Sequence, residues 1–91
     1  GHMAAAFNVG CHLMTGQGCE KNPVEAAEWF EKAADEGNIM QACVNLANMC
    51  REGVGVPKNL ERAKKLFGRY SMTDDNCSRM LRVVQEEIDS S

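Results

Sequence analysis

The sequence has no apolar run approaching the roughly 18 residues that a membrane-spanning helix needs. It shows no secretory signal peptide, and its formal net charge is only −3 over 91 residues. Nucleic-acid-binding domains usually carry a strongly basic face, and basic surfaces also attract acidic membranes. We therefore expect no membrane segment, and neither nucleic acid nor an acidic membrane surface as the main partner.

Length limits the chain to one small domain. Its composition, 44% apolar and 25% charged, is ordinary for a soluble globular protein. A domain of this size buries roughly 60–70% of the surface that its unfolded chain exposes. Residues 1–3, with the sequence GHM, look like a cloning scar, so we expect the domain to have been excised from a longer protein.

The five cysteines are an odd number, so they cannot all pair within one chain. Cys43 and Cys50 share an expected helix and lie about 10 Å apart by helical rise, whereas a disulfide allows only ~7 Å between Cα atoms. We predict that the thiols are mostly buried and reduced, and hence that the protein occupies the cytoplasm or another reducing compartment. A redox role through the cysteines is an alternative.

Residues suited to metal binding or catalysis form no familiar pattern. Cys11, His12 and Cys19 carry potential zinc ligands, but their spacing matches no known zinc motif and a fourth ligand is not apparent. Neighbouring residues on a helix point roughly 100° apart, so Cys11 and His12 make a poor nucleophile–base pair. The GQG and GVG loops lack the Lys-Ser/Thr signature of a phosphate-binding loop. We predict no metal, no cofactor and no enzymatic activity, with a metal role for the cysteines as a remote alternative.

The sequence does contain an internal repeat. The segment GQGCEKNPVEAAEWFEKAA at 16–34 returns as GVGVPKNLERAKKLFGRYS at 53–71, which is a period of 37 residues. Self-similarity at such a period is typical of a solenoid, in which each unit buries its apolar face against the next. The matching pairs are Ala5 and Ala42, Asn8 and Asn45, Gly16 and Gly53, Gly18 and Gly55, Lys21 and Lys58, Asn22 and Asn59, Ala26 and Ala63, and Phe30 and Phe67.

Each copy carries the signals of a helical hairpin. The paired glycines of the turns supply backbone conformations that other residues avoid. Asn22 can cap the second helix, Pro23 suits its first position, and Glu25 completes a capping box. Gly37 and Asn38 then end this helix with a left-handed cap. The expected turn and cap residues are Gly16, Gly18, Asn22, Gly37, Gly53, Gly55 and Asn59.

Apolar residues at helical spacing predict five helices. Small residues at Ala6 and Gly10 would allow another helix to approach the first one closely. The aromatic residues expected in the core and between repeats are Trp29, Phe30, Phe67 and Tyr70. The expected helices cover about 4–14, the residues from the Asn22 cap to Gly37, 39 or 40 to 52, the residues after the Asn59 cap, and those from Cys77 onward, after a polar linker at 71–76.

The repeat unit resembles the Sel1-like repeat, a relative of the tetratricopeptide repeat. In the second copy, the residues that carry the resemblance are Ala42, Asn45, Leu46, Gly53, Val54, Gly55, Val56, Lys58, Asn59, Ala63 and Phe67. In the first copy, they are Asn8, Gly10, Gly16, Gly18, Asn22, Glu25, Ala26, Ala27, Trp29, Phe30, Lys32, Ala33, Ala34, Gly37 and Asn38.

This resemblance covers roughly residues 4–70 and implies an all-α fold. The expected architecture is an α/α solenoid of two Sel1-like helical hairpins plus a C-terminal capping helix, wound as a short right-handed superhelix. We expect repeat 1 at 4–38, repeat 2 at 39–73 and the capping helix at 74–91. The last helix would cover the open apolar face of the second hairpin.

A polar face on the first helix of each hairpin is the candidate site. Asparagine is a poor helix former because its side chain competes for backbone hydrogen bonds, so asparagines repeated on one face need a reason. The resemblance implies that these helices line a concave, protein-binding surface, where amides can hold a peptide backbone. We predict an adaptor or scaffold that binds a peptide or helix of another protein there. The face consists of Asn8, Gln41, Asn45, Asn48 and Glu52, with His12 and Met49 beside it.

Other interpretations stay open. Nothing comparable to the capping helix covers the N-terminal end, and about three repeats are usually needed for stability. We therefore expect either a missing upstream repeat or self-association through the exposed first helix, which would make the segment a structural spacer or self-association unit. The fourth helix has a basic side, formed by Arg62, Lys64, Lys65 and Arg69. That side is either solvated or docks an acidic partner segment, and it lacks the interleaved aromatics that stack nucleic-acid bases.

Overall fold

The computed structural model describes residues 2–90, and their side chains from residue 4 onward. Within this range the chain forms α-helices and no β-strand, which confirms the predicted all-α class. None of the described helices is both long and apolar enough to cross a bilayer. The helices are α1 (His2–Thr15), α2 (Pro23–Gly37), α3 (Met40–Glu52), α4 (Leu60–Arg69) and α5 (Asp75–Ser90).

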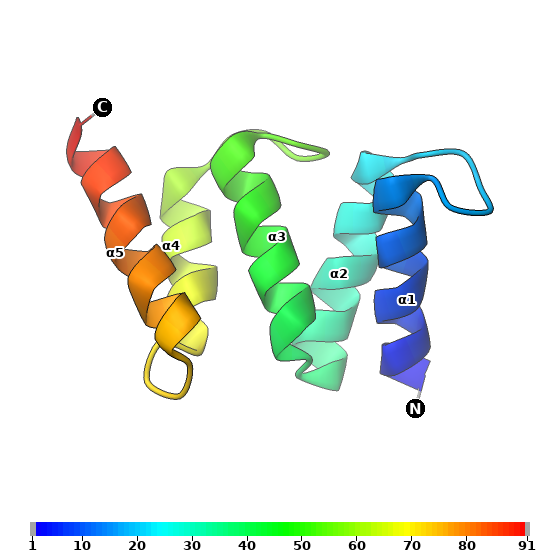
Figure 1. The fold of residues 1–91 in the computed structure, drawn as a ribbon, viewed down its shortest axis with the longest axis horizontal. Coiled ribbons are helices and arrows are strands. Elements are labelled where there is room, and N and C mark those ends of the chain that lie inside the picture. Colours follow the sequence, from blue (N-terminus) through cyan, green and yellow to red (C-terminus); the bar gives the residue numbers. More distant parts are fainter. Residues whose placement is uncertain (1, 91) are drawn as a thin grey trace.

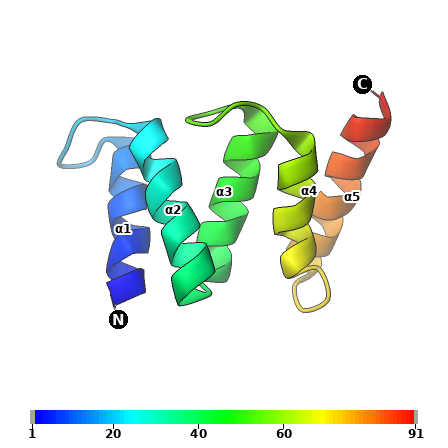
Figure 2. The same ribbon diagram turned by 180° about the vertical axis from the view of Figure 1, so that it is seen from behind.

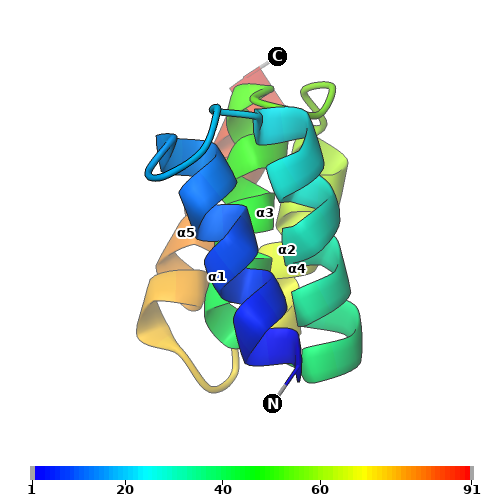
Figure 3. The same ribbon diagram turned by 90° about the vertical axis from the view of Figure 1, so that its right-hand side faces the viewer.

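The helices stand side by side in chain order, and each runs antiparallel to the one before it (Figure 1). Viewed along its longest dimension, the molecule has two layers, with α1, α3 and α5 in one and α2 and α4 in the other (Figure 3). Figure 2 looks onto the layer of α2 and α4. The molecule measures 39 × 26 × 17 Å. It is thus a short solenoid of two hairpins, α1–α2 and α3–α4, with α5 packed on α4.

The period of 37 residues extends to the hydrogen bonds of the two turns. Gly16 and Gly53 both have a φ of 77°, and Gly18 and Gly55 both have a φ of 73°, a left-handed region that glycine enters without a steric cost. Each turn returns to the end of the preceding helix through the same bond. In the first hairpin the Asn22 N–H donates to the carbonyl of Leu13, and in the second the Asn59 N–H donates to that of Cys50, both at 2.8 Å.

The caps of α2 show which local signals decide the helix ends. The Asn22 Oδ1 accepts a hydrogen bond from the Glu25 N–H at 3.1 Å. The reciprocal half of the expected capping box does not form, because the Asn22 N–H already donates to Leu13. At the other end, Gly37 is the last helical residue, and Asn38 adopts the left-handed backbone with a φ of 50°. Of the two residues expected to end this helix, Asn38 therefore takes the left-handed conformation, which asparagine also tolerates.

Two helices extend beyond their expected limits. α1 begins at His2, inside the segment interpreted as a cloning scar, and ends at Thr15. α5 begins at Asp75 rather than at Cys77, because the Asp74 Oδ2 accepts a hydrogen bond from the Cys77 N–H at 3.0 Å and so caps the first turn. Gly1 and Ser91, which belong to the expected scar and capping segments, lie outside the described residues.

The core lies between the two layers and is built around Phe30 and Phe67, which are 1% and 0% exposed. α1 approaches α2 closely at Gly10, where a Cβ atom would lie 2.8 Å from Cε1 of Phe30. The Phe7 ring also packs against Phe30, with ring centroids 5.9 Å apart and planes inclined by 54°. Trp29 and Tyr70 are half-buried at the margin of the core rather than inside it.

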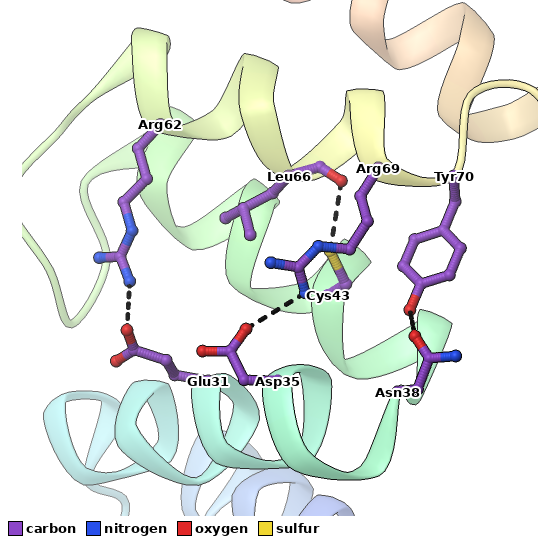
Figure 4. A network of polar contacts seen from close by, with 8 residues as sticks. All are labelled: Glu31, Asp35, Asn38, Cys43, Arg62, Leu66, Arg69 and Tyr70. Carbon is purple, nitrogen blue, oxygen red and sulfur yellow. Dashed lines mark hydrogen bonds and ion pairs between the residues drawn. The ribbon is translucent and has the colours of Figure 1, made fainter.

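Polar contacts join the second helices of the two hairpins (Figure 4). Arg62 pairs with Glu31 at 2.9 Å, and Arg69 pairs with Asp35 at 3.2 Å. The Tyr70 hydroxyl donates to the Oδ1 of Asn38 at 2.6 Å. Three of the four residues of the basic side, Arg62, Lys65 and Arg69, therefore line the junction with α2. Exposed ion pairs stabilise a fold by only about 0–1 kcal/mol each, so these pairs add little to the stability of the domain.

Candidate functional site

A cleft of about 260 Å³ opens between α1 and α3. It exists because these helices each pack on α2 and hardly touch each other. Val54 of the second turn also lines it. The lining residues are Cys11, Met14, Thr15, Phe30, Asn45, Asn48, Met49, Glu52 and Val54.

The floor of the cleft is apolar and its rim is polar. Phe30 and Met49 are 1% and 3% exposed and form part of the floor. Asn45 and Asn48 are half-buried, and Glu52 is exposed. An apolar pocket with a few placed polar groups is the usual form of a ligand site in proteins.

The two asparagines of α3 differ in what they can still bind. The Gln41 Nε2 donates to the Asn45 Oδ1 at 3.1 Å, which leaves the Asn45 side-chain N–H groups as donors. Among the described residues, no hydrogen bond engages the Asn48 side chain. A half-buried amide offers two donors and one acceptor, so Asn48 can pair with both the N–H and the C=O of an incoming backbone.

Glu52 gives the cleft a negative end. It is the last residue of α3, where the helix macrodipole already contributes a partial negative charge. The neighbouring Arg51 does not cancel this charge, because its guanidinium pairs with Glu87 of α5 at 2.6 Å. Among the lining residues in the described part of the chain, Glu52 is the one with a formal charge. This end of the cleft therefore favours a cationic group.

The structure brings together four of the seven side chains proposed from the sequence. Asn45, Asn48, Met49 and Glu52 line the cleft. The others, Asn8, His12 and Gln41, are exposed and lie outside it. Asn8 and His12 are on α1, and Gln41 acts on the cleft only through its bond to Asn45.

Sequence reasoning missed the α1 wall of the cleft. Cys11, Met14 and Thr15 form that wall, and their spacing of three and one places them on one helical face. That spacing was a usable signal. Phe30 and Val54 come from a second helix and a turn, so no local pattern connects them with the cleft.

Most of the cysteines are placed for packing rather than for reaction. Cys43, Cys50 and Cys77 are buried, Cys11 is half-buried and Cys19 is exposed. Burial raises the pKa of Cys11, Cys43 and Cys50, so these thiols are protonated and weakly nucleophilic at neutral pH.

The proposed ligands near the first turn do not converge. The Cys19 Sγ donates to the backbone carbonyl of His12 at 3.6 Å rather than meeting its imidazole. Within the described residues, no group of three His, Cys, Asp or Glu side chains is placed to hold a metal ion.

Known proteins match the part of the chain that contains the two hairpins. A family model described as Sel1 repeat matches residues 4–38 and 41–69. Mouse protein sel-1 homolog 2 is 32% identical over 73 residues, which are 80% of this chain and 11% of that protein. The human protein of the same name is 30% identical over 73 residues, with the same coverage. The chain thus spans about a tenth of the length of these curated relatives.

A solved structure is similar over most of the chain. It is the crystal structure of a Sel1 repeat protein from Oxalobacter formigenes, with a TM-score of 0.79 and 32% sequence identity. The similarity covers 87% of this chain and 32% of that one.

Proposed function

Because this chain belongs to the Sel1 repeat family, a non-enzymatic family whose repeats generally mediate protein–protein interactions, we propose that it holds a segment of a partner protein in the cleft between α1 and α3. The domain would then act as an adaptor or scaffold. The observation that carries this proposal is the half-buried, unengaged amide of Asn48 above the apolar floor formed by Met49 and Phe30.

The dimensions of the cleft favour a side chain over a whole small molecule. Its volume of about 260 Å³ lies below the roughly 300–1,000 Å³ of typical small-molecule pockets. The preferred segment therefore places one large apolar side chain on the floor, pairs its backbone with Asn48, and carries a lysine or arginine that reaches Glu52.

Selection from a random peptide library tests this proposal without knowledge of the natural partner. The baits are the unchanged chain, Asn48→Arg, which fills the cleft, and Asn8→Arg, which makes the same change outside it. We expect peptides with an apolar residue and a nearby basic residue to be enriched on the unchanged chain and on Asn8→Arg. Circular dichroism would first establish that all three baits are equally helical.

Two outcomes would contradict the proposal. Selected peptides that bind Asn48→Arg as well as the unchanged chain would move the site out of the cleft. Equal loss of binding in Asn48→Arg and Asn8→Arg would point to a broad surface of α1 and α3 rather than to this cleft.

A further inference from the structure

The side of α2 that faces away from α4 forms a second, separate surface. We name it the open face of α2 and define it as Glu25, Glu28, Trp29 and Lys32, which line a shallow depression of about 210 Å³. The three charged side chains are exposed, and Trp29 is half-buried. The Lys32 Nζ lies 6.0 Å from the centre of the Trp29 ring.

The repeat shows what the corresponding face does in the second hairpin. Advancing each residue of the open face by one period of 37 gives Arg62, Lys65, Leu66 and Arg69 of α4. These four line the junction with α2, where Leu66 is 7% exposed. In that junction Arg62 pairs with Glu31 and Arg69 pairs with Asp35 (Figure 4). The face that is open on α2 is therefore, on α4, an interface with the second helix of the preceding hairpin.

The turns lead to the same conclusion. A Cβ atom on Gly55 would lie 2.4 Å from the carbonyl oxygen of Pro23, the first residue of α2. Gly18 occupies the same place in the first turn with the same φ of 73°, and no described atom lies within 4 Å of where its Cβ would be. A helix lying on the open face in the manner of α2 on α4 would begin against Gly18.

We propose that the open face of α2 binds the second helix of a further Sel1-like hairpin, and that its charges select which hairpins fit. On α4 both ends of the face are basic, and α2 offers two acids, Glu31 and Asp35. On the open face Glu25 stands in the place of Arg62, and Lys32 in the place of Arg69. The matching helix therefore has a basic residue where α2 has Glu31 and an acidic residue where α2 has Asp35.

This charge order discriminates against a second copy of the chain stacked in the same manner. Such a copy would place its Glu31 opposite Glu25, a pair of like charges that disfavours the contact, and its Asp35 opposite Lys32, a pair of opposite charges that favours it. Head-to-tail contacts between identical copies do not close and can grow into fibres. A helix with a basic residue in the place of Glu31 and an acidic residue in the place of Asp35 makes both pairs favourable, so this mixed charge order favours a distinct hairpin over self-stacking.

A tandem protein tests the proposal. Residues 4–40, one full period, are duplicated ahead of residue 4, with Trp29 of the added hairpin replaced by phenylalanine so that Trp29 of the original chain is the sole reporter. The added hairpin carries either its own Glu31 or Glu31→Lys, and each version is combined with Glu25 or Glu25→Lys in the receiving hairpin. Trp29 emission and the urea midpoint are measured for all four proteins.

The added hairpin should shift Trp29 emission to shorter wavelength relative to the unextended chain. With Glu25 present, the Glu31→Lys version should raise the folding equilibrium constant about two- to fivefold over the unchanged version, as expected for one exposed ion pair. Glu25→Lys should reverse that order, and the double-mutant cycle isolates this coupling. Glu61→Lys, an exposed charge change on α4, is the matched control and should leave the order intact.

Three results would contradict the proposal. Unchanged Trp29 emission in every tandem protein, with the unextended chain folded by circular dichroism, would show that no hairpin docks on this face. An order that Glu25→Lys fails to reverse would remove the charge selection. Sedimentation of the unextended chain tests whether a second copy binds this face instead. Dimerisation accompanied by the Trp29 shift would assign the face to a second copy and overturn the proposal.

Discussion

The two hairpins have the same backbone but different surroundings. Their paired glycines have identical φ angles of 77° and 73°, and their caps make the same hydrogen bonds. The second hairpin packs against α2 on one side and α5 on the other. The first hairpin packs against α3 on its inner side only, and no described atom lies within 4 Å of where a Cβ on Gly18 would be. Local geometry is therefore fixed within each hairpin, whereas the cost of changing a residue depends on its neighbours.

The largest difference between the hairpins is expected for Gly55→Ala and Gly18→Ala. A positive φ costs alanine about 1–2 kcal/mol, and this cost applies to both variants. Only at Gly55 does the new Cβ also meet backbone, 2.4 Å from the Pro23 carbonyl oxygen, which cannot swing aside as a side chain can. We expect Gly55→Ala to lower the free energy of unfolding by more than roughly 3 kcal/mol and Gly18→Ala by the backbone term alone. Urea unfolding followed by circular dichroism measures both. Equal losses would mean that the second turn does not pack on α2 as described.

Short-range signals explain how much of this fold could be predicted. Asn22 and Asn59 each cap a helix through a bond to a residue three positions later, and the glycine turns recur with the repeat. Such features depend only on neighbouring residues, so spacing reveals them. The start of α5 was misplaced because Asp74, Asp75 and Asn76 are adjacent residues that can all cap a helix, and spacing alone does not show that the Asp74 carboxylate accepts from the Cys77 N–H.

The cleft could be predicted only in part for the same physical reason. Helical spacing placed Asn45, Asn48 and Glu52 on one face of α3, and all three line the cleft. It could not show that Asn8 lies outside the cleft, since that depends on how α1 is rotated against α2. The close contact of Gly10 with Phe30 fixes this rotation, and it joins residues 20 positions apart in the sequence.

The packing of α1 on α2 offers a second way to compare the hairpins. Phe7 and Gly10 of the first hairpin correspond, one period later, to Val44 and Ala47 of the second. The first hairpin thus combines a large residue with a glycine, where the second hairpin combines a smaller residue with an alanine. Gly10→Ala should destabilise the domain by about 1–3 kcal/mol, as overpacking of a core does, because its Cβ would lie 2.8 Å from Cε1 of Phe30.

The double variant Phe7→Val with Gly10→Ala should recover part of that loss, because it lets the Phe30 ring move toward the vacated space. The control is Gly68→Ala in α4, whose Cβ would make an ordinary contact at 3.9 Å with Leu81. Without a clash, this change should stabilise the helix by about 0.5–1 kcal/mol. Thermal unfolding of the four variants gives the comparison, and strictly additive effects of Phe7→Val and Gly10→Ala would refute the compensation.

The pH dependence of the free energy of unfolding should show a smaller difference between the two hairpins, because the buried thiols lie in and beside the second hairpin. Burial, with a hydrogen bond to Asp74 and the charge of its carboxylate, raises the pKa of Cys77 to about 11 from an ordinary value of 9.0. Between these values the folded protein keeps a proton that the unfolded chain has released. The free energy of unfolding therefore falls as the pH rises from about 9 toward 11, and this group contributes no pH dependence below 9.

Urea midpoints at pH 8 and pH 10 test this expectation. The decrease between the two pH values should be smaller in Cys77→Ala than in the unchanged chain, while Cys19→Ala, which removes an exposed thiol, should keep the full decrease. Residual pH dependence in Cys77→Ala is expected from Cys43 and Cys50, whose pKa values burial also raises. If Cys77→Ala and Cys19→Ala lose the same stability between pH 8 and pH 10, then the Cys77 thiol is not held protonated at the junction of α4 and α5.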